Sequence, residues 1–197
     1  MKKFETLELD VSKLRTGDLV LMRYGYMPNA IAIRGFINMK QTPDKRCPFN
    51  HVALVVMVHG KPYIFEAVGG GTDKPTSALT RLDCKKIAVR RPEFGFRSEF
   101  FEKIATEYSA RGTKYDYKGT FVEQAIFQSL GLFATKSEEE GDEKLYCSEY
   151  YARVINRLIP EMYNGENGEI PYYMVDPQDL YIDDRYKTIF EGKAITK

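Results

Sequence analysis

The sequence predicts an α+β domain in which a small antiparallel sheet or barrel from the N-terminal half packs against helices from the second half. Two observations predict this class. Between residues 50 and 91, apolar residues form short runs that are rich in β-branched side chains and are separated by glycine or proline turns. From residue 98 onward, apolar residues instead recur every three or four positions, as on one face of a helix. The chain has 197 residues, enough for one well-formed core, so we expect a single domain over residues 1–197.

The strands of the predicted sheet are separated by turn residues. Residues 50–58 are the most strand-like run, and their almost continuous apolar character predicts burial on both faces. The turn His59-Gly60-Lys61-Pro62 predicts an antiparallel hairpin, with Glu66 as a carboxylate inside its second, apolar strand. We expect the opening strand to follow Gly17-Asp18. The predicted strands are Leu19–Arg23, Asn50–Val58, Tyr63–Val68 and Lys86–Arg91, the last closed by Pro92.

Helices are predicted in the second half. One runs from Ser98 to Gly112, where glycine favours the left-handed conformation that ends many helices, and another begins near Cys147 and ends before Pro160. The residues expected on their buried faces are Phe100, Phe101, Ile104, Ala105, Tyr108, Tyr151, Val154, Ile155, Leu158 and Ile159. Shorter helical or irregular segments are expected at 28–36, 121–132 and 175–180, a polar loop at 41–48, and a solvated acidic loop at 136–144.

Charge and cysteine content limit the partners and the compartment. Lysine plus arginine (29) and aspartate plus glutamate (28) nearly cancel, so we expect no nucleic-acid partner. The three cysteines contain no Cys-x-x-Cys pair, which indicates neither a disulfide framework nor a zinc site. The sequence shows no signal peptide and no apolar run long enough to span a membrane, so we expect a soluble, cytoplasmic protein.

Cys147 stands where a helix is expected to begin. In the first turn of a helix, unpaired backbone N–H groups and the positive end of the helix dipole favour a thiolate over a thiol. This position is therefore typical of a nucleophilic cysteine. The alternative is that Cys147 is one more small buried apolar residue. The choice depends on which groups lie beside it.

A nucleophilic cysteine needs an imidazole that accepts the thiol proton, and a group that orients the imidazole. His51 and His59 are the two histidines, and strand alternation puts both on the same face of one strand, roughly 26 Å apart. The simplest hairpin register puts Glu66 on that face as well, opposite Val55 and roughly 13 Å along the strand from either histidine. Strand geometry alone therefore does not choose between them.

A resemblance to a known family does choose. The segment from Gly112 to Gly119, followed by Cys147-Ser148, resembles the tyrosine-to-nucleophile half of the NlpC/P60 papain-like hydrolases. Here the histidine strand precedes the cysteine, which is similar to the circularly permuted branch of that superfamily, the YiiX/YaeF-like amidases. The motifs that match this branch, spread over roughly residues 14 to 180, are Gly17-Asp18-Leu19, Asn50-His51-Val52, Phe65-Glu66-Ala67 and Tyr146-Cys147-Ser148-Glu149. The chain differs in having Asn50 where serine is more usual, and a long segment between Tyr115 and Cys147.

The resemblance implies a permuted papain-like fold and a role for each matching residue. Cys147 would be the nucleophile, His51 the general base and acid, and Glu66 the residue that orients His51. Tyr115 would help to hold the substrate or oxyanion, together with the backbone N–H of Cys147. The reaction implied is hydrolysis of a peptide or cell-wall-derived amide through a thioester, and it needs no metal or organic cofactor.

Other interpretations stay open at this stage. Permuted relatives of the lecithin:retinol acyltransferase type share the order of histidine before cysteine, so a lipid-directed thiol hydrolase or acyltransferase is one alternative. A non-catalytic ligand-binding protein of the same fold is another. Glu66 could simply pair with a surface cation. We expect Cys84 to be structural and His59 to be a turn residue in solvent, and we expect no metal site at Cys47 and His51.

Overall fold

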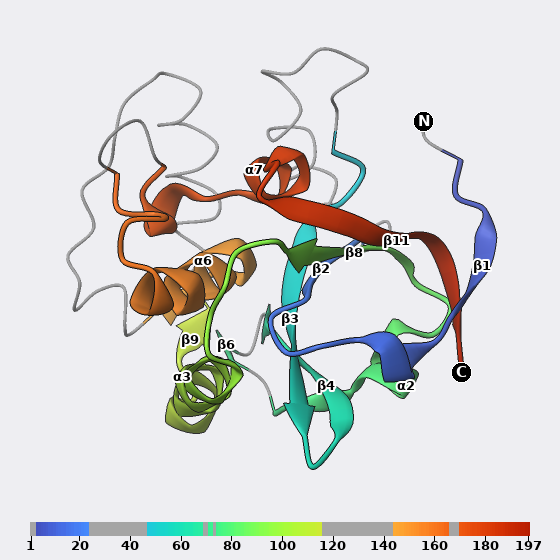
Figure 1. Ribbon diagram of the computed structural model, residues 1–197, viewed down its shortest axis with the longest axis horizontal. Coiled ribbons are helices and arrows are strands. Elements are labelled where there is room, and N and C mark those ends of the chain that lie inside the picture. The colour runs from blue at the N-terminus through green and yellow to red at the C-terminus, as the bar shows by residue number, and fades with distance from the viewer. Residues whose placement is uncertain (1–2, 24–46, 69–70, 73, 116–143, 166–169) are drawn as a thin grey trace.

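The computed structural model describes residues 3–23, 47–68, 71–72, 74–115, 144–165 and 170–197, and it has an α+β architecture built on a curled, half-barrel sheet (Figure 1). The seven strands of this sheet lie in the order β1-β11-β8-β2-β3-β4-β7. All neighbouring strands are antiparallel except β1 and β11. The strands are β1 (Thr6–Leu9), β2 (Leu19–Met22), β3 (His51–Val58), β4 (Lys61–Phe65), β7 (Thr76–Ser77), β8 (Lys86–Pro92) and β11 (Tyr186–Thr196).

Two short strand pairs lie outside this sheet. Strands β5 (Ala67–Val68) and β6 (Gly71–Thr72) are antiparallel, whereas β9 (Lys114–Tyr115) and β10 (Lys144–Leu145) are parallel. The backbone N–H of Thr72 donates to the carbonyl of Thr113 at 2.7 Å, which links the first pair to the start of the second.

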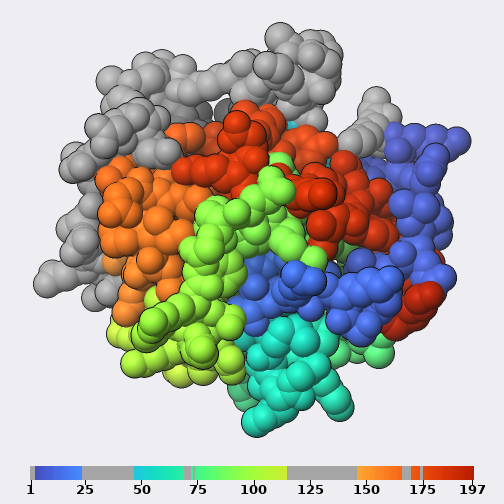
Figure 2. Space-filling model, viewed as in Figure 1, coloured from blue at the N-terminus to red at the C-terminus, as the bar shows by residue number. Residues whose placement is uncertain are grey.

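Helices cover both faces of the curled sheet. Figure 1 shows α3 (Ser98–Arg111) and α6 (Cys147–Leu158) on one side of β3, and α2 (Ala78–Leu82) on the other. Helix α7 (Pro177–Ile182) lies above β11 in this view, and the short turns η1 (Val11–Lys13) and η4 (Tyr172–Met174) complete the described elements. In the space-filling view, the β3–β4 hairpin (cyan) projects from the lower edge of the molecule, beside α3 (Figure 2).

The alternation of side chains along β3 separates two hydrophobic clusters. Val52, Leu54 and Val56 belong to the cluster that contains the buried residues of α3 and α6. Ala53 and Val55 belong to the cluster that contains Ala78 and Leu82 of α2. The predicted burial of this strand on both faces is therefore confirmed.

The predicted strands are confirmed, but three strands of the sheet, β1, β7 and β11, were not predicted. Strand β1 precedes β2, so the prediction that residues 19–23 form the opening strand is wrong. Strand β11 contains lysine, glutamate and glycine, and it has no continuous apolar run. It is a strand because it pairs on both sides, with β1 and with β8. Its local sequence does not predict a strand, because the strand depends on its pairing partners rather than on its own residues.

The main helices are also confirmed. Gly112 ends α3 in the left-handed conformation (φ 61°), and Asp176 caps α7 by accepting the N–H groups of Gln178 and Asp179. The prediction that Phe100 is buried is wrong, since its side chain is 48% exposed while Phe101 is fully buried. The segments predicted at 28–36 and 121–132, and most of the loops predicted at 41–48 and 136–144, lie outside the described residues.

The register of the β3–β4 hairpin differs from the predicted one by two residues. Val55 pairs with Ile64, not with Glu66, because the turn consists of His59 and Gly60 alone. Both turn residues have positive φ (48° and 75°), as a tight type I′ turn requires. The shorter turn moves Glu66 two residues closer to His51 along the strand than predicted.

The Gly17-Asp18 motif fixes the entry to β2. The Asp18 carboxylate, which is fully buried, accepts two hydrogen bonds from Arg91 of β8, at 2.8 and 2.7 Å, and one from the N–H of Arg15 at 2.9 Å. The N–H of Gly17 donates to Val55 of β3 at 2.9 Å. The motif therefore ties the start of β2 to the strands on both of its sides.

Arg90, next to Arg91 but on the opposite face of β8, holds the C-terminal segment. Its side chain is 6% exposed and donates to the backbone carbonyls that end α7 and begin β11. These acceptors are the carbonyls of Leu180, Tyr181, Asp183 and Tyr186. A guanidinium inside the protein thus satisfies carbonyls that the helix end leaves without intrahelical partners.

Gly17 and Gly60 give a matched test of the packing around the motif. Both have positive φ (91° and 75°), but a Cβ at Gly17 would lie 2.1 Å from the Phe96 ring, whereas a Cβ at Gly60 would have nothing within 4 Å. We expect Gly60→Ala to lower the free energy of unfolding by about 1 kcal/mol, for backbone strain alone. Gly17→Ala should cost about 2–4 kcal/mol, because Phe96 must also move. Denaturant unfolding measures both, and equal costs would contradict a tight contact at Phe96.

Candidate active site

Cys147 is the first residue of α6. Tyr146 precedes the helix in an extended conformation (φ −99°), and its backbone N–H donates to the Glu149 carboxylate at 3.5 Å. The Tyr146 hydroxyl donates to the carbonyl of Tyr173 in η4, which ties the residue before the helix to that turn. The helix start is therefore fixed by its neighbours, and Cys147 is held there at only 6% exposure.

His51 is the first residue of β3 and lies opposite Met22 of β2. Its side chain is hydrogen-bonded both to Cys147 and to Glu66, and its Nε2 is 2.7 Å from Glu66 Oε2. Since Nε2 is taken by the carboxylate, Nδ1 is the nitrogen left for the Cys147 sulfur. The structure thus brings together the three residues on which the sequence prediction depends, although they come from β3, from the end of β4 and from α6.

Glu66 lies at the break between β4 and β5. It is 6% exposed, and both of its oxygens are bound. Arg81 of α2 donates from Nε to Oε1 at 2.5 Å and from Nη2 to Oε2 at 2.8 Å. Oε2 therefore accepts from both His51 and Arg81. The alternative that Glu66 pairs with a surface cation does not describe this site, because the Arg81 side chain is only 17% exposed.

The electrostatics of the pair favour a thiolate and an imidazolium. Burial alone lowers the pKa of His51, but the nearby Cys147 and Glu66 outweigh it and raise the pKa to about 9. Burial also raises the pKa of the Cys147 thiol. The charge and hydrogen bond of His51, together with backbone N–H groups of Val52 and Ser148, outweigh that effect, so the pKa of Cys147 lies below its ordinary value.

The remaining candidates lie apart from this group. His59 is exposed in the hairpin turn, as predicted, and Cys84 is exposed in a left-handed turn (φ 57°). The Cys47 thiol is buried against the carbonyls of Phe49 and Pro177, at 3.6 and 3.7 Å. Tyr115 lies in β9, and its backbone is paired with Leu145 of β10, two residues before Cys147. The role of the Tyr115 side chain stays a prediction.

Sequence reasoning missed Arg81 and the N–H of Val52. Arg81 lies in a helix of five residues, and its neighbours form no motif that links it to Glu66. The Val52 N–H is available because the β3–β4 ladder stops at the pair of Leu54 and Phe65, a point that the sequence did not locate to the residue. The one sequence feature that pointed to Arg81 is Glu66 itself, because a carboxylate expected inside an apolar strand needs a basic residue beside it.

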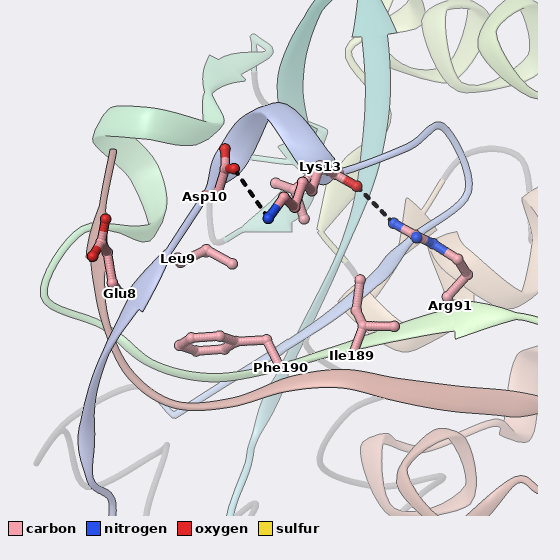
Figure 3. Close-up of a pocket in the computed structure, with 8 residues that line it drawn as sticks. Glu8, Leu9, Asp10, Lys13, Arg91, Ile189 and Phe190 are labelled. Carbon is pink, nitrogen blue, oxygen red and sulfur yellow. Dashed lines mark hydrogen bonds and ion pairs between the residues drawn. The ribbon is translucent and has the colours of Figure 1, made fainter.

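A pocket of about 270 Å³ lies away from Cys147, His51 and Glu66, between β1, η1, β8 and β11 (Figure 3). Its lower side in this view is apolar, with Ile189 and Phe190, and its rim carries charges that are already paired. Lys13 lies 3.5 Å from Asp10, and its carbonyl accepts from Arg91 at 2.9 Å. The residues that line it are Glu8, Leu9, Asp10, Lys13, Leu14, Arg91, Ile189 and Phe190.

Within residues 3–23, 47–68, 71–72, 74–115, 144–165 and 170–197, no group of three or more His, Cys, Asp or Glu side chains is arranged to hold a metal ion. In the same ranges, no helix has both the length and the apolar character that crossing a membrane requires.

Comparison with known proteins gives a structural relative. No protein-family model matches the chain, and no curated protein matches it in sequence. The fold is similar to that of the metalloprotein YiiX from Escherichia coli O157:H7, with a TM-score of 0.58 and 20% sequence identity. The similarity covers 90% of this chain and 97% of that one. At this level of identity, the similarity shows a shared α+β fold, which agrees with the YiiX-like resemblance of the sequence.

The ion pair predicts how Cys147 reacts with iodoacetamide as the pH changes. The rate for an ordinary thiol falls about tenfold per pH unit below its pKa of about 8.5, because only the thiolate reacts. For Cys147 we expect less than about a threefold change between pH 6.5 and 8.5, because the thiolate persists while His51 keeps its proton, up to its pKa of about 9. Peptide mass spectrometry measures this rate beside that of the exposed Cys84.

The control is a His51→Gln variant, in which Cys147 should regain the steep pH dependence of an ordinary thiol. If the alkylation rate of Cys147 in the unmodified protein had the same pH dependence as that of Cys84, the assignment of an ion pair between Cys147 and His51 would be wrong.

Proposed function

We propose that this chain is a cysteine-dependent hydrolase of amide bonds, built as a single domain with the circularly permuted papain-like arrangement of the NlpC/P60 superfamily. The observation that carries the proposal is the continuous hydrogen-bonded path from Cys147 through His51 to Glu66. A buried thiol next to an imidazole that is itself oriented by a carboxylate is the arrangement of an activated nucleophile. The fold shared with YiiX agrees with the YiiX-like resemblance of the sequence, and it is this resemblance that implies the permuted order.

In the first half of the proposed reaction, the Cys147 thiolate attacks the carbonyl carbon of an amide. A C–S bond forms and the carbonyl oxygen becomes an oxyanion. The His51 imidazolium then gives its proton to the leaving nitrogen, the C–N bond breaks, and a free amine departs. Glu66 keeps the ring of His51 oriented throughout, because it accepts the Nε2–H bond. The product left on the enzyme is a thioester of Cys147.

In the second half, neutral His51 removes a proton from water, and the resulting hydroxide equivalent attacks the thioester carbon. The C–S bond breaks, a carboxylic acid leaves, and Cys147 returns as a thiolate beside the His51 imidazolium. The ground state of this cycle is the charged pair described above. The raised pKa of His51 and the lowered pKa of Cys147 both favour it.

Both tetrahedral intermediates need donors for their oxyanion. The N–H groups in the first turn of α6 have no intrahelical acceptor, and we assign the first donor to the backbone N–H of Cys147, as the family resemblance implies. We assign the second donor to Tyr115, on the strength of its match to the family tyrosine and of the β9–β10 pairing next to Cys147. Loss of one such donor costs about 10²–10³-fold in kcat.

The metal implied by the description of YiiX does not fit the residues seen here. The candidate donors beside Cys147 are His51 and Glu66, and both oxygens of Glu66 are bound by Arg81. No group of three donors among the described residues is arranged for an ion. No step of the proposed reaction therefore involves a metal ion.

Replacing the nucleophile tests the proposal. We expect Cys147→Ala to lower kcat/KM by at least about 10³-fold on any substrate the protein hydrolyses, because the covalent step is lost. Cys84→Ala, at an exposed turn, should leave activity unchanged. Suitable substrates are acylated peptide anilides and acyl amides, with release of the amine as the readout. Full activity in the Cys147 variant would exclude the proposed nucleophile.

Mass spectrometry of Cys147 in the same protein distinguishes the classes of acyl donor. Incubation with peptide amides should give a transient mass increase on Cys147 equal to the acyl group. A stable increase with phospholipid donors, and none with peptides, would favour the lipid-directed alternative. Failure of every donor, with an ordinary pH profile for Cys147, would favour a non-catalytic binding protein.

A further inference from the structure

We propose that Arg81 is a positioning residue of this site: its guanidinium holds the Glu66 carboxylate in the orientation that fixes the ring of His51. This inference rests on the proposed function, since it concerns the same three residues. Its basis is a pair of hydrogen bonds, from Arg81 Nε to Oε1 at 2.5 Å and from Nη2 to Oε2 at 2.8 Å. A planar guanidinium that binds both oxygens fixes the plane of the carboxylate, which a single-point contact does not.

Glu66 depends on such a contact because of where it lies. The β3–β4 ladder ends at the pair of Leu54 and Phe65, and β5 begins only at Ala67. The strand ladder therefore does not set the direction of the Glu66 side chain. Its position against His51 is set by the side chains that bind it, and Arg81 provides two of the three hydrogen bonds described on its oxygens.

Arg81 is itself well fixed. Ala78 and Leu82 of the same helix are fully buried, in the cluster that also contains Ile64 of β4. The Arg81 side chain is 17% exposed, and that of Glu66 is 7% exposed, so the pair is largely shielded from solvent. A shielded pair on a short, packed helix can transmit the position of α2 to His51.

The charges of the site also require a cation at this place. Thiolate, imidazolium and carboxylate sum to one negative charge, and Arg81 brings the total to zero. Without Arg81, the buried site would carry one unbalanced negative charge, which is costly in the interior of a protein. Arg81 therefore acts on Cys147 through two intermediates, Glu66 and His51.

The chain offers a matched control in Arg91 and Asp18. Arg91 also binds both oxygens of a buried carboxylate, from Nε to Oδ1 at 2.8 Å and from Nη2 to Oδ2 at 2.7 Å. Its side chain is 24% exposed, close to the value for Arg81. This pair joins β8 to the start of β2, so its loss disturbs a comparable ion pair without touching Glu66 or His51.

The experiment compares Arg81→Ala, Arg81→Lys and Arg91→Ala in the full chain, by the iodoacetamide rate of Cys147 between pH 6.5 and 8.5 and by kcat/KM. We expect Arg81→Ala to lower both at pH 7 by about 10–100-fold and to restore a steep rise of the alkylation rate with pH. Arg81→Lys keeps the charge but not the two-point contact, and should be intermediate. Arg91→Ala should change either rate less than about twofold in protein that remains folded.

Chemical rescue separates positioning from a general loss of structure. Methylguanidinium at about 20 mM should raise the rate of Arg81→Ala at least fivefold and leave Arg91→Ala unchanged, because only the first variant leaves a guanidinium-shaped space beside the reactive group. Folded Arg81→Ala with the wild-type pH profile would overturn the inference. If that variant does not fold, a wild-type profile in Arg81→Lys would overturn it instead.

The outcomes distinguish this inference from the proposed function. Hydrolysis that is present and unaffected by Arg81 would contradict the role of Arg81 alone. If no substrate were hydrolysed while Cys147 kept a flat pH profile that depends on Arg81, the role of Arg81 would stand and hydrolysis would not.

Discussion

The register of the β3–β4 hairpin is the constraint on which the candidate site depends. His51 opens β3 and Glu66 follows β4, so the number of residues in the turn between these strands decides whether the two side chains can meet. A turn of two residues with positive φ leaves Glu66 within reach of His51, and the contact of 2.7 Å follows. A hairpin with a longer turn would place the same two residues too far apart to interact.

The sequence was a good guide to the elements, but a poor guide to how the residues that it singled out meet. Strand β3 is an almost continuous apolar run and helix α6 has strong local periodicity, and both are where these patterns indicated. Strand β11 carries little, because its pairing partners make it a strand. The hairpin register and the contact of Arg81 with Glu66 depend on backbone torsions and on residues distant in sequence, which no local pattern encodes.

Three arginines with largely buried side chains perform related tasks in the described structure. Arg81 binds the carboxylate beside the histidine, Arg91 binds the carboxylate at the entry to β2, and Arg90 binds the carbonyls between α7 and β11. In each case a planar group with several donors connects segments that are separated in sequence. The cost of burying these charges is offset by hydrogen bonds to carboxylates or to several carbonyls.

The place of β11 has a consequence for the order in which the protein folds during synthesis. This strand lies between β1 and β8, so Thr6 pairs with Lys193 and Lys86 pairs with Lys193 from the other side. Until residues 186–196 have left the ribosome, β8 has an open edge and β1 lacks the partner it has in the sheet. The hairpin can form earlier, since both of its strands precede β11, whereas α6 completes its packing only when its Tyr151 ring meets Tyr186 of β11. Completion of the sheet is therefore a late, long-range step, of the kind that slows folding and exposes strand edges to other chains.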